Sequence, residues 1–104
     1  MEQWLLLIES ACKDLAREKE FNDWYDRIHI PDVLSGCPDI KRATRYILYA
    51  PSGGHGKYLA AYEIETQDID RTMAAHKANI EAKYAAGRKS DLLEVVSRRL
   101  CKVA

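Results

Sequence analysis

The sequence predicts an α+β fold in which one antiparallel sheet is covered by two helices. Segments with the alternation and the β-branched or aromatic content of strands are separated by segments whose apolar residues recur every three or four positions, as in amphipathic helices. Their order is strand, helix, strand, strand, helix, strand. A chain of 104 residues, 47% of them hydrophobic, is large enough for one domain with a modest core, residues 1–104.

The first predicted strand is the apolar run Trp4–Ile8, which Glu9 and Ser10 close. Because both faces of this strand would be apolar, we expect it to be buried on both sides. Residues 11–19 are mixed and charged. They predict a loop that leads into a helix, or the first turn of that helix.

The first helix is predicted over residues 18–30. Its apolar residues recur at helical spacing: Phe21, Trp24 or Tyr25, and Ile28. Pro31 lacks an amide hydrogen and clashes with the preceding turn, so we expect the helix to break or restart there. His29 would then stand at an interrupted helix end. Residues 32–34 would form a short turn that Gly36 can end.

The second strand is predicted over residues 40–50 and the third over residues 57–65. One side of the second strand would carry Ile40, Arg42, Thr44, Tyr46 and Leu48. One side of the third would carry Tyr58, Ala60, Tyr62 and Ile64. The glycine-rich residues 51–56, which include His55, predict a flexible hairpin connection. Free amides there could cradle a phosphate, but no Gly-Lys-Ser/Thr run or helix follows.

The second helix is predicted to have Thr66 or Asp68 as its N-cap and to end or bend near Gly87. Its apolar stripe consists of Ile69, Met73, His76, Ile80 and Tyr84. Leu92 and Leu93 predict a short turn, and residues 95–103 alternate as a last strand. This β-α-β-β-α-β order is that of the ferredoxin-like plait.

Large side chains also predict that the face of the sheet away from the helices is not simply polar. The residues concerned are Tyr46, Leu48, Tyr58 and Tyr62. Soluble monomers rarely expose a large contiguous apolar patch, so we expect the sheet of a second subunit to cover this face. The predicted assembly is a homodimer.

Charge and composition argue against several classes of protein. Sixteen basic and sixteen acidic residues give zero net charge, which argues against nucleic acid as a partner. No apolar run approaches the roughly 20 residues needed to cross a bilayer. The short run after Glu2 does not have the form of a secretory signal. Three widely spaced cysteines favour free thiols in a reducing, cytoplasmic compartment.

Three segments carry a resemblance to a known family. They are Phe21-x-x-Trp24-Tyr25-x-x-x-His29-x-Pro31-Asp32-Val33-Leu34, Ala43-Thr44-Arg45-Tyr46 and Tyr58-Leu59-Ala60-x-Tyr62-Glu63. Together they resemble the EthD-like branch of the dimeric α/β-barrel superfamily, over residues 4–103. The resemblance implies a homodimeric α/β barrel with small-molecule pockets between each sheet and its helices. Because relatives differ widely in reaction, it implies architecture more than chemistry.

His29 is the strongest catalytic candidate, because an imidazole titrates near neutral pH and can both take and give a proton. Alternatively, it is a structural histidine that bonds free carbonyls at a helix terminus. Asp32 would cap the turn or act as the partner of His29 or of a ligand. Tyr46 is the third catalytic candidate. Arg45 needs a partner, either Glu63 or an anionic substrate group.

The predicted substrate pocket draws on rings and polar groups from several elements. Its candidate residues are Trp24, Tyr25, Arg45, Tyr58, Tyr62 and His76. The strand tyrosines, Tyr49 among them, could donate hydrogen bonds to a phenolate or enolate, or could simply pack. His76 could equally be a core or interface histidine. The three histidines lack metal-ligand spacing, so we expect no metal and no cofactor.

These observations predict a small cofactor-independent enzyme, a lyase, isomerase or cyclase. It would transfer protons through His29 on a hydrophobic aromatic or polyketide-like carbonyl compound, with tyrosines or Arg45 holding the oxyanion. The alternative among enzymes is a cofactor-free monooxygenase. The competing class is a non-catalytic small-molecule-binding accessory protein.

Overall fold

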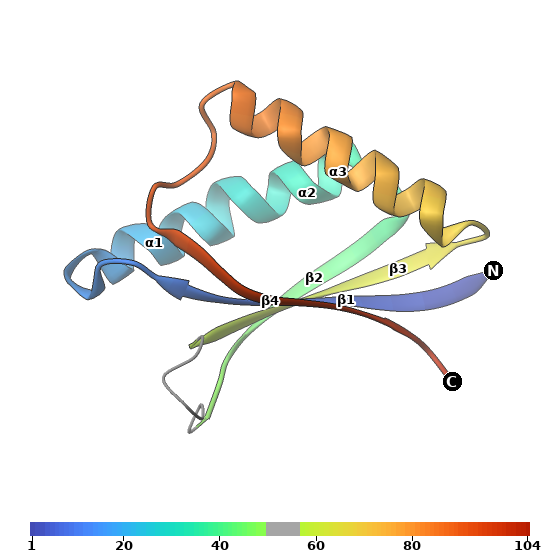
Figure 1. Ribbon diagram of the computed structural model, residues 1–104, viewed down its shortest axis with the longest axis horizontal. Coiled ribbons are helices and arrows are strands. Elements are labelled where there is room, and N and C mark those ends of the chain that lie inside the picture. Colours follow the sequence, from blue (N-terminus) through green and yellow to red (C-terminus); the bar gives the residue numbers. More distant parts are fainter. Residues whose placement is uncertain (50–56) are drawn as a thin grey trace.

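The computed structural model describes residues 1–49 and 57–104 and has the predicted α+β architecture. Four strands form one antiparallel sheet in the order β2-β3-β1-β4. They are β1 (Glu2–Cys12), β2 (Ile40–Ile47), β3 (Tyr58–Thr66) and β4 (Leu93–Lys102). All the helices lie on one side of this sheet, the upper side in Figure 1. The predicted glycine-rich connection, with His55, falls outside the described residues.

The central strand β1 is longer than the apolar run that predicted it. It pairs with β3 on one side and with β4 on the other, and the β4 pairing continues to the partners Cys12 and Leu93. Leu93 therefore begins a strand and does not lie in the predicted turn. A short 3₁₀ segment, η1 (Leu15–Arg17), occupies part of the predicted loop.

The prediction that the first helix breaks at Pro31 was wrong. Helical backbone runs without interruption through α1 (Glu18–Trp24), the π-helical turn η2 (Tyr25–His29) and α2 (Ile30–Gly36). In η2 the amide of Ile30 donates to the carbonyl of Tyr25, five residues back. The wider turn comes just before the proline, which then lies in the first turn of α2, where a missing amide hydrogen costs nothing.

This continuity corrects two further predictions. His29 lies inside a continuous helix and not at its end, and residues 32–34 are helical and do not form a turn. Gly36 is the last residue of α2, where the prediction had it end a separate short turn. It also lies where α2 meets the second long helix, α3 (Ile69–Ala85), and a Cβ atom on Gly36 would come within 2.0 Å of the Asn79 side chain. The Asn79 amide donates to the Asp32 carbonyl at 2.9 Å, which holds the two helices together.

The second predicted helix is confirmed at both ends. Asp68 is its N-cap, and the Asp68 carboxylate accepts a hydrogen bond from the Arg71 amide. After the helix, Gly87 adopts a φ of 82°, a left-handed conformation that glycine reaches without a steric penalty. The predicted stripe faces the core, and Ile69, Met73 and Ile80 pack against it.

The core lies between the sheet and the helices, and it corrects the assignment of two tyrosines. Tyr58 and Tyr62 are buried on the helix side of β3, and not on the helix-free face. On the opposite side of β3 lie Leu59 and Ala61, which share an open hollow of the helix-free face with Tyr46. A register irregularity between Ile40 and Arg42 also interrupts the simple alternation predicted for the second strand.

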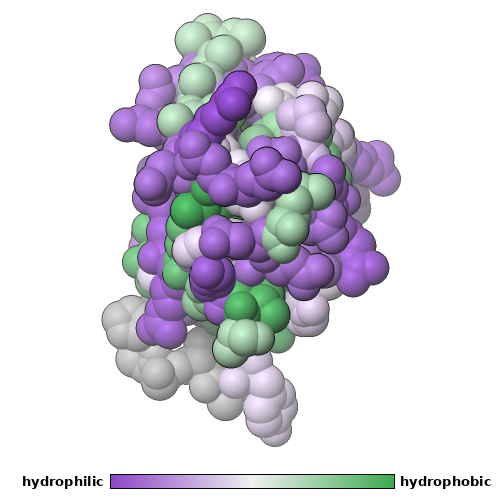
Figure 2. Space-filling model, turned by 90° about the vertical axis from the view of Figure 1, so that its right-hand side faces the viewer, coloured by the Kyte–Doolittle hydropathy of each residue, from purple (hydrophilic) through white to green (hydrophobic). Residues whose placement is uncertain are grey.

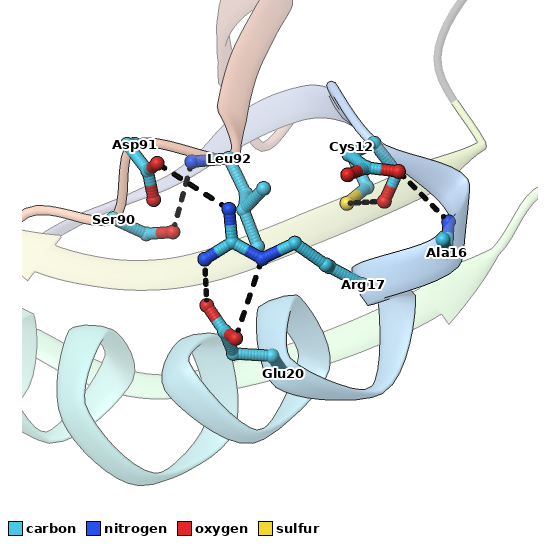
Figure 3. A network of polar contacts seen from close by, with 8 residues as sticks. Cys12, Ala16, Arg17, Glu20, Ser90, Asp91 and Leu92 are labelled. Atoms are coloured by element: carbon cyan, nitrogen blue, oxygen red, sulfur yellow. Dashed lines mark hydrogen bonds and ion pairs between the residues drawn. The ribbon is translucent and has the colours of Figure 1, made fainter.

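Polar contacts tie the start of the helical layer to the loop before β4. The Arg17 guanidinium contacts the Glu20 carboxylate at 2.5 Å and the Asp91 carboxylate at 3.5 Å, as Figure 3 shows. In the same loop the Ser90 hydroxyl accepts a hydrogen bond from the Leu92 amide. These contacts are solvent-exposed, so they position the loop more than they stabilise the fold.

Candidate functional site

A small cavity of about 60 Å³ lies between the sheet and the helical layer. Strand β1 contributes Ile8, and β4 contributes Leu93 and Val95 to its apolar wall. Its polar lining comes from both helices and two strands: Tyr25, His29, Tyr62, His76, Tyr84 and Arg98. The structure therefore brings together four of the residues predicted for the site, Tyr25, His29, Tyr62 and His76.

A second, larger hollow of about 550 Å³ adjoins this cavity. Both hollows have His76, Tyr84 and Arg98 in their walls, together with two isoleucines. The larger hollow adds apolar groups from β1 and α3, including Leu6 and Met73. The pair thus forms a polar inner chamber beneath a wider and more apolar outer one.

The His29 ring is held by aromatic neighbours. It stacks on Trp24 with ring centroids 4.9 Å apart and meets the edge of Tyr25 at 5.0 Å. Tyr84 of α3 lies on another side, 6.1 Å away. The residue is 9% exposed, and no described residue donates a hydrogen bond to its imidazole or accepts one from it. The imidazole is therefore held in place by packing, and it lines the cavity with its ring nitrogens free of protein partners.

Burial lowers the pKa of His29 to about 4, with the neighbouring His76 and Arg45 acting in the same direction. Asp32 opposes this shift through its negative charge. Burial also lowers the pKa of His76, and the charge of Arg98 adds to that effect. Both histidines of the cavity are consequently neutral at pH 7, so each has one ring nitrogen with a free lone pair.

Two residues of one helix reach the cavity together because they are four positions apart, and the π-helical turn between them keeps them on one side. Phe21 and Tyr25 are one α-helical turn apart and both are buried. The following turn contains one additional residue in its hydrogen-bonded ring, which keeps His29 on the buried side. Such turns are frequent at functional sites because they redirect side chains within a helix.

Two buried polar atoms of the cavity lack a hydrogen-bond partner among the described residues. They are the Tyr62 hydroxyl and Nδ1 of His76. Burial, reinforced by the neighbouring Tyr25, raises the pKa of Tyr62, so its hydroxyl stays protonated at any physiological pH. An unsatisfied buried donor is costly and is satisfied when a ligand or a water molecule binds.

Asp32 contacts the basic side chain of a neighbouring loop. Its carboxylate accepts two hydrogen bonds from Arg88, at 2.7 and 3.0 Å. Hydrogen bonding to this guanidinium lowers the pKa of Asp32, which is therefore ionised at neutral pH. The indole Nε1 of Trp24 donates to the Arg88 carbonyl at 2.9 Å, so this loop also fixes the ring that stacks on His29.

Arg45 has a partner other than the acid predicted for it. Its guanidinium donates to Asp26 at 3.0 Å and to Asn22 at 2.9 Å. The predicted partner, Glu63, instead accepts from Arg42 at 2.7 Å on the helix-free face. The β2 side chain projects into the core side of the sheet and meets the acid that the first helix offers there.

Arg45 also forms a cation–π cluster with buried rings. Its guanidinium carbon lies 4.3 Å from the ring centre of Tyr25 and 4.9 Å from that of Tyr58. The Tyr58 hydroxyl contacts Glu18 and accepts a hydrogen bond from Asn22. Arg45 and Tyr58 therefore support the back of the site, behind Tyr25. Neither lines the cavity.

Tyr46 lies far from these groups in the architecture. It is 51% exposed and lies on the helix-free face, in a hollow of about 530 Å³ with Leu5 and Leu7 of β1. The structure thus separates Tyr46 from His29 and Asp32 by the thickness of the sheet.

Two polar residues of the cavity, Tyr84 and Arg98, were not among the predicted site residues. Tyr84 continues the stripe of α3 that contains His76 and Ile80, and this spacing could have identified it. Arg98 lies in the strand predicted over residues 95–103 and was not singled out there. A register irregularity in the pairing of β4 with β1 puts Arg98 on the same side as Val95, and only the structure shows that Arg98 reaches both hollows.

Within residues 1–49 and 57–104, no three His, Cys, Asp or Glu side chains are grouped so that they could hold a metal ion. In the same ranges, no helix combines the length and apolar character needed to cross a bilayer.

Comparison with solved structures shows the fold. HapK from Hahella chejuensis superimposes with a TM-score of 0.62 at 13% identity, over 97% of this chain and 92% of that one. An EthD-like protein from Ralstonia eutropha JMP134 gives a TM-score of 0.64 at 14% identity, over 99% and 93%. A dimeric ferredoxin-like protein from an uncultured marine organism gives 0.61 at 12% identity, over 99% and 96%.

These likenesses confirm the ferredoxin-like fold and the resemblance to EthD-like proteins at the level of architecture. No family model matches the sequence, and no curated protein matches it. The identities are too low to carry a reaction from one protein to another.

Proposed function

We propose that this chain is a small enzyme that moves a proton on a hydrophobic carbonyl compound, with His29 as the base and then the acid. The observation that supports this most is the state of His29: neutral, fixed by aromatic packing, without a hydrogen bond to any described residue, and facing a cavity. A lone pair held in this way can accept a proton from a carbon next to a carbonyl group.

The other cavity groups suit the remaining half of this reaction. When the proton leaves, negative charge develops on the carbonyl oxygen, and the unpaired Tyr62 hydroxyl can donate a hydrogen bond to it. Return of the proton at another position, or attack of the enolate carbon on a second carbonyl, would give an isomerase or a cyclase. Loss of a leaving group from the enolate would give a lyase.

For the remaining predicted residues we propose supporting roles. Asp32 is a positioning residue that acts through Arg88 and the Trp24 ring. Trp24, Arg45 and Tyr58 fix the rings around the cavity, and Tyr46 belongs to an interface between subunits. We propose a cytoplasmic location, because all three cysteines are free thiols.

The competing hypothesis is that the cavity only binds its ligand. The low pKa of His29 favours it, since a base with a pKa of about 4 is weak. The two hypotheses differ in one measurable property. A binding protein would leave the exchange of hydrogens on the ligand unchanged, whereas a proton-transfer enzyme would accelerate it.

The test uses 2-tetralone, an aromatic ketone, as the probe in deuterium oxide, and NMR follows loss of the hydrogens next to its carbonyl. We expect wild-type protein to accelerate the exchange and His29→Gln, which keeps a polar side chain of similar volume, to abolish the acceleration. Lys19→Gln, an exposed change on α1, is the control and should exchange like wild type. Equal acceleration by wild type and His29→Gln would disprove the role of His29. Oxygen uptake during turnover would instead assign the chain to the cofactor-free monooxygenases.

We further propose that the chain works as a homodimer joined through the helix-free face. The hollow of about 530 Å³ on this face has half-buried apolar groups from two strands, among them Leu5, Leu7 and Leu59. Covering such groups is favourable by roughly 25 cal/mol per Å². Two related folds are described as dimeric ferredoxin-like proteins. Sedimentation equilibrium at micromolar concentration should give twice the 11.9 kDa chain mass, and a non-associating monomer would contradict the dimer.

A further inference from the structure

The charge at the site is unbalanced, and the imbalance comes from one residue. Arg98 lines both the inner and the outer hollow, and among residues 1–49 and 57–104 no carboxylate forms an ion pair with it. The outer hollow also contains Lys77 and Glu81, but these lie 4.0 Å apart and offset each other. The nearby Arg45 is already paired with Asp26. One uncompensated positive charge therefore faces the space.

The inner chamber is also rich in hydrogen-bond donors. The Tyr62 hydroxyl is protonated and has no hydrogen-bond partner among the described residues, and Nδ1 of the neutral His76, a donor in one tautomer and an acceptor in the other, has none among them either. The Arg98 guanidinium supplies up to five further N–H groups and accepts none. No Asp or Glu side chain lines this chamber. A ligand group with acceptor atoms therefore finds donors in this chamber, and a carboxylate in addition matches the charge of Arg98.

The sizes of the two spaces indicate which part of a ligand each one can hold. About 60 Å³ is the space of roughly two water molecules, which suits a carboxylate or a carbonyl oxygen but not a ring. The adjoining 550 Å³ has apolar walls from Leu6, Ile8, Met73 and Ile80, with Tyr84 between the two spaces. An apolar ring fits there, against aliphatic side chains on one side and an aromatic ring on another.

We infer that the cavity selects an aromatic carboxylate, held with its negative charge at Arg98 and its ring in the outer hollow beneath α3. This inference deepens the proposed function and rests on the same site. An anionic ligand would also serve the proposed base, because a negative charge nearby favours the protonated imidazole and raises the pKa of His29 from about 4 toward neutrality. The ligand would then add to the negative charge of Asp32, which alone does not offset the burial of His29.

The experiment compares two probes that share a ring, 2-naphthoate and the uncharged 2-naphthylmethanol. Binding to the full chain at pH 7.5 is followed by two-dimensional NMR, which reports both affinity and the amides that shift. We expect naphthoate to bind at least about tenfold more tightly than the alcohol, and Arg98→Gln to remove that preference by weakening only the acid. Arg98→Lys keeps the charge but loses the paired N–H donors of the guanidinium, so it should retain part of the preference for naphthoate.

Arg99→Gln is the matched control. It removes the same charge from the adjacent residue of β4, whose side chain points to the other face of the sheet, and it should leave both affinities unchanged if the elution volume is that of wild type. Equal affinity of wild type for the two probes, or an equal loss in Arg98→Gln and Arg99→Gln, would overturn the inference. Absence of binding by both probes would overturn it too.

A further measurement separates this inference from the proposed function. The pKa of His29, read from its ring protons, should rise in the naphthoate complex and stay low in the alcohol complex. If naphthoate binds through Arg98 but 2-tetralone exchange does not depend on His29, the proton-transfer function fails and the ligand class stands. If exchange depends on His29 but naphthoate shows no preference for Arg98, only the ligand class fails.

Discussion

The two faces of the sheet carry similar side chains in opposite surroundings. Tyr62 and Tyr46 are both strand tyrosines, but the first is 1% exposed beneath the helices and the second is 51% exposed on the open face. The helix-covered side holds the cavity, and the open side holds a broader hollow. Figure 2 shows the end of the molecule that is on the right in Figure 1, where the surface is mostly hydrophilic with a few hydrophobic groups. The two tyrosines differ in what packs against them, since the helices cover Tyr62 and leave Tyr46 open. Residue type alone therefore does not tell whether a strand side chain stabilises the monomer or belongs to the proposed interface with a second subunit.

The largest expected effect tests the covered face. Phe21 is fully buried and contacts Tyr25 and Tyr58 through its ring, so Phe21→Ala should lower the free energy of unfolding by about 3–5 kcal/mol. Tyr46→Ala, on the open face, should cost far less in a sample diluted to the monomer. Urea unfolding at low protein concentration measures both. Similar losses for the two variants would remove the distinction between the faces.

The next effect tests the open face. Leu7 lies in its hollow, and Leu7→Asp would place a charge against the proposed second subunit. We expect dimer affinity to fall by about 30-fold or more, equivalent to roughly 2 kcal/mol or above, while the monomer stays folded. Sedimentation equilibrium with far-UV circular dichroism separates the two effects. A variant that still associates like wild type would place the interface elsewhere.

A smaller effect tests the buried histidine of the covered face by pH. The pKa of His29 is lowered from 6.5 to about 4 in the folded chain, so between these pH values the unfolded chain binds more protons. Stability should therefore be greatest above pH 6.5 and should fall as the pH drops toward 4, by on the order of 1–3 kcal/mol. Further loss below pH 4 would come from carboxylates such as Asp32, whose pKa is also lowered.

His29→Gln supplies the control for this pH dependence. It removes the titrating group, so its stability should vary less between pH 6.5 and pH 4 than that of wild type. His76, whose pKa is lowered in the same direction, would account for the remainder. Unfolding by urea at several pH values gives the two curves, and parallel curves would assign the effect to other groups.

The smallest effect compares one ion pair from each side of the sheet. Asp32 is buried and accepts two hydrogen bonds from the half-exposed Arg88, so Asp32→Asn should cost about 1 kcal/mol. Glu63 pairs with Arg42 in a much more exposed setting, and Glu63→Gln should cost a few tenths of a kcal/mol in the monomer. Thermal unfolding of the two variants in parallel provides the comparison. A larger loss of stability in Glu63→Gln than in Asp32→Asn would contradict the assignment of the stronger ion pair to the helix-covered side.

The fold could be predicted because its signals are local. Alternation marked β2 and β3, and the stripe through His76 and Ile80 marked α3 with its cap at Asp68. Pro31 misled because its effect depends on hydrogen bonding in the preceding turn, and a π turn absorbs the missing donor. Propensity rules describe the average helix and do not anticipate this local adjustment.

The site could be predicted in part, since Tyr25, His29, Tyr62 and His76 were candidates and all four line the cavity. His29 and Tyr25 lie on the same helix, and their pairing followed from spacing. The meeting of Tyr62, His76 and Arg98 depends on how three elements pack, which no spacing within the chain encodes. The partner of Arg45 was missed for the same reason, because an acid on a neighbouring helix competes with one on the next strand.

The contact between Gly36 and Asn79 sets the distance between α2 and α3 in the helical layer. Because glycine has no side chain, α2 and α3 can approach until backbone meets amide, and Asn79 lies one residue before Ile80 in the roof of both hollows. Any larger residue at position 36 would push α2 and α3 apart and would move α3 away from the sheet. The width of both hollows therefore depends on position 36, although Gly36 lines neither of them.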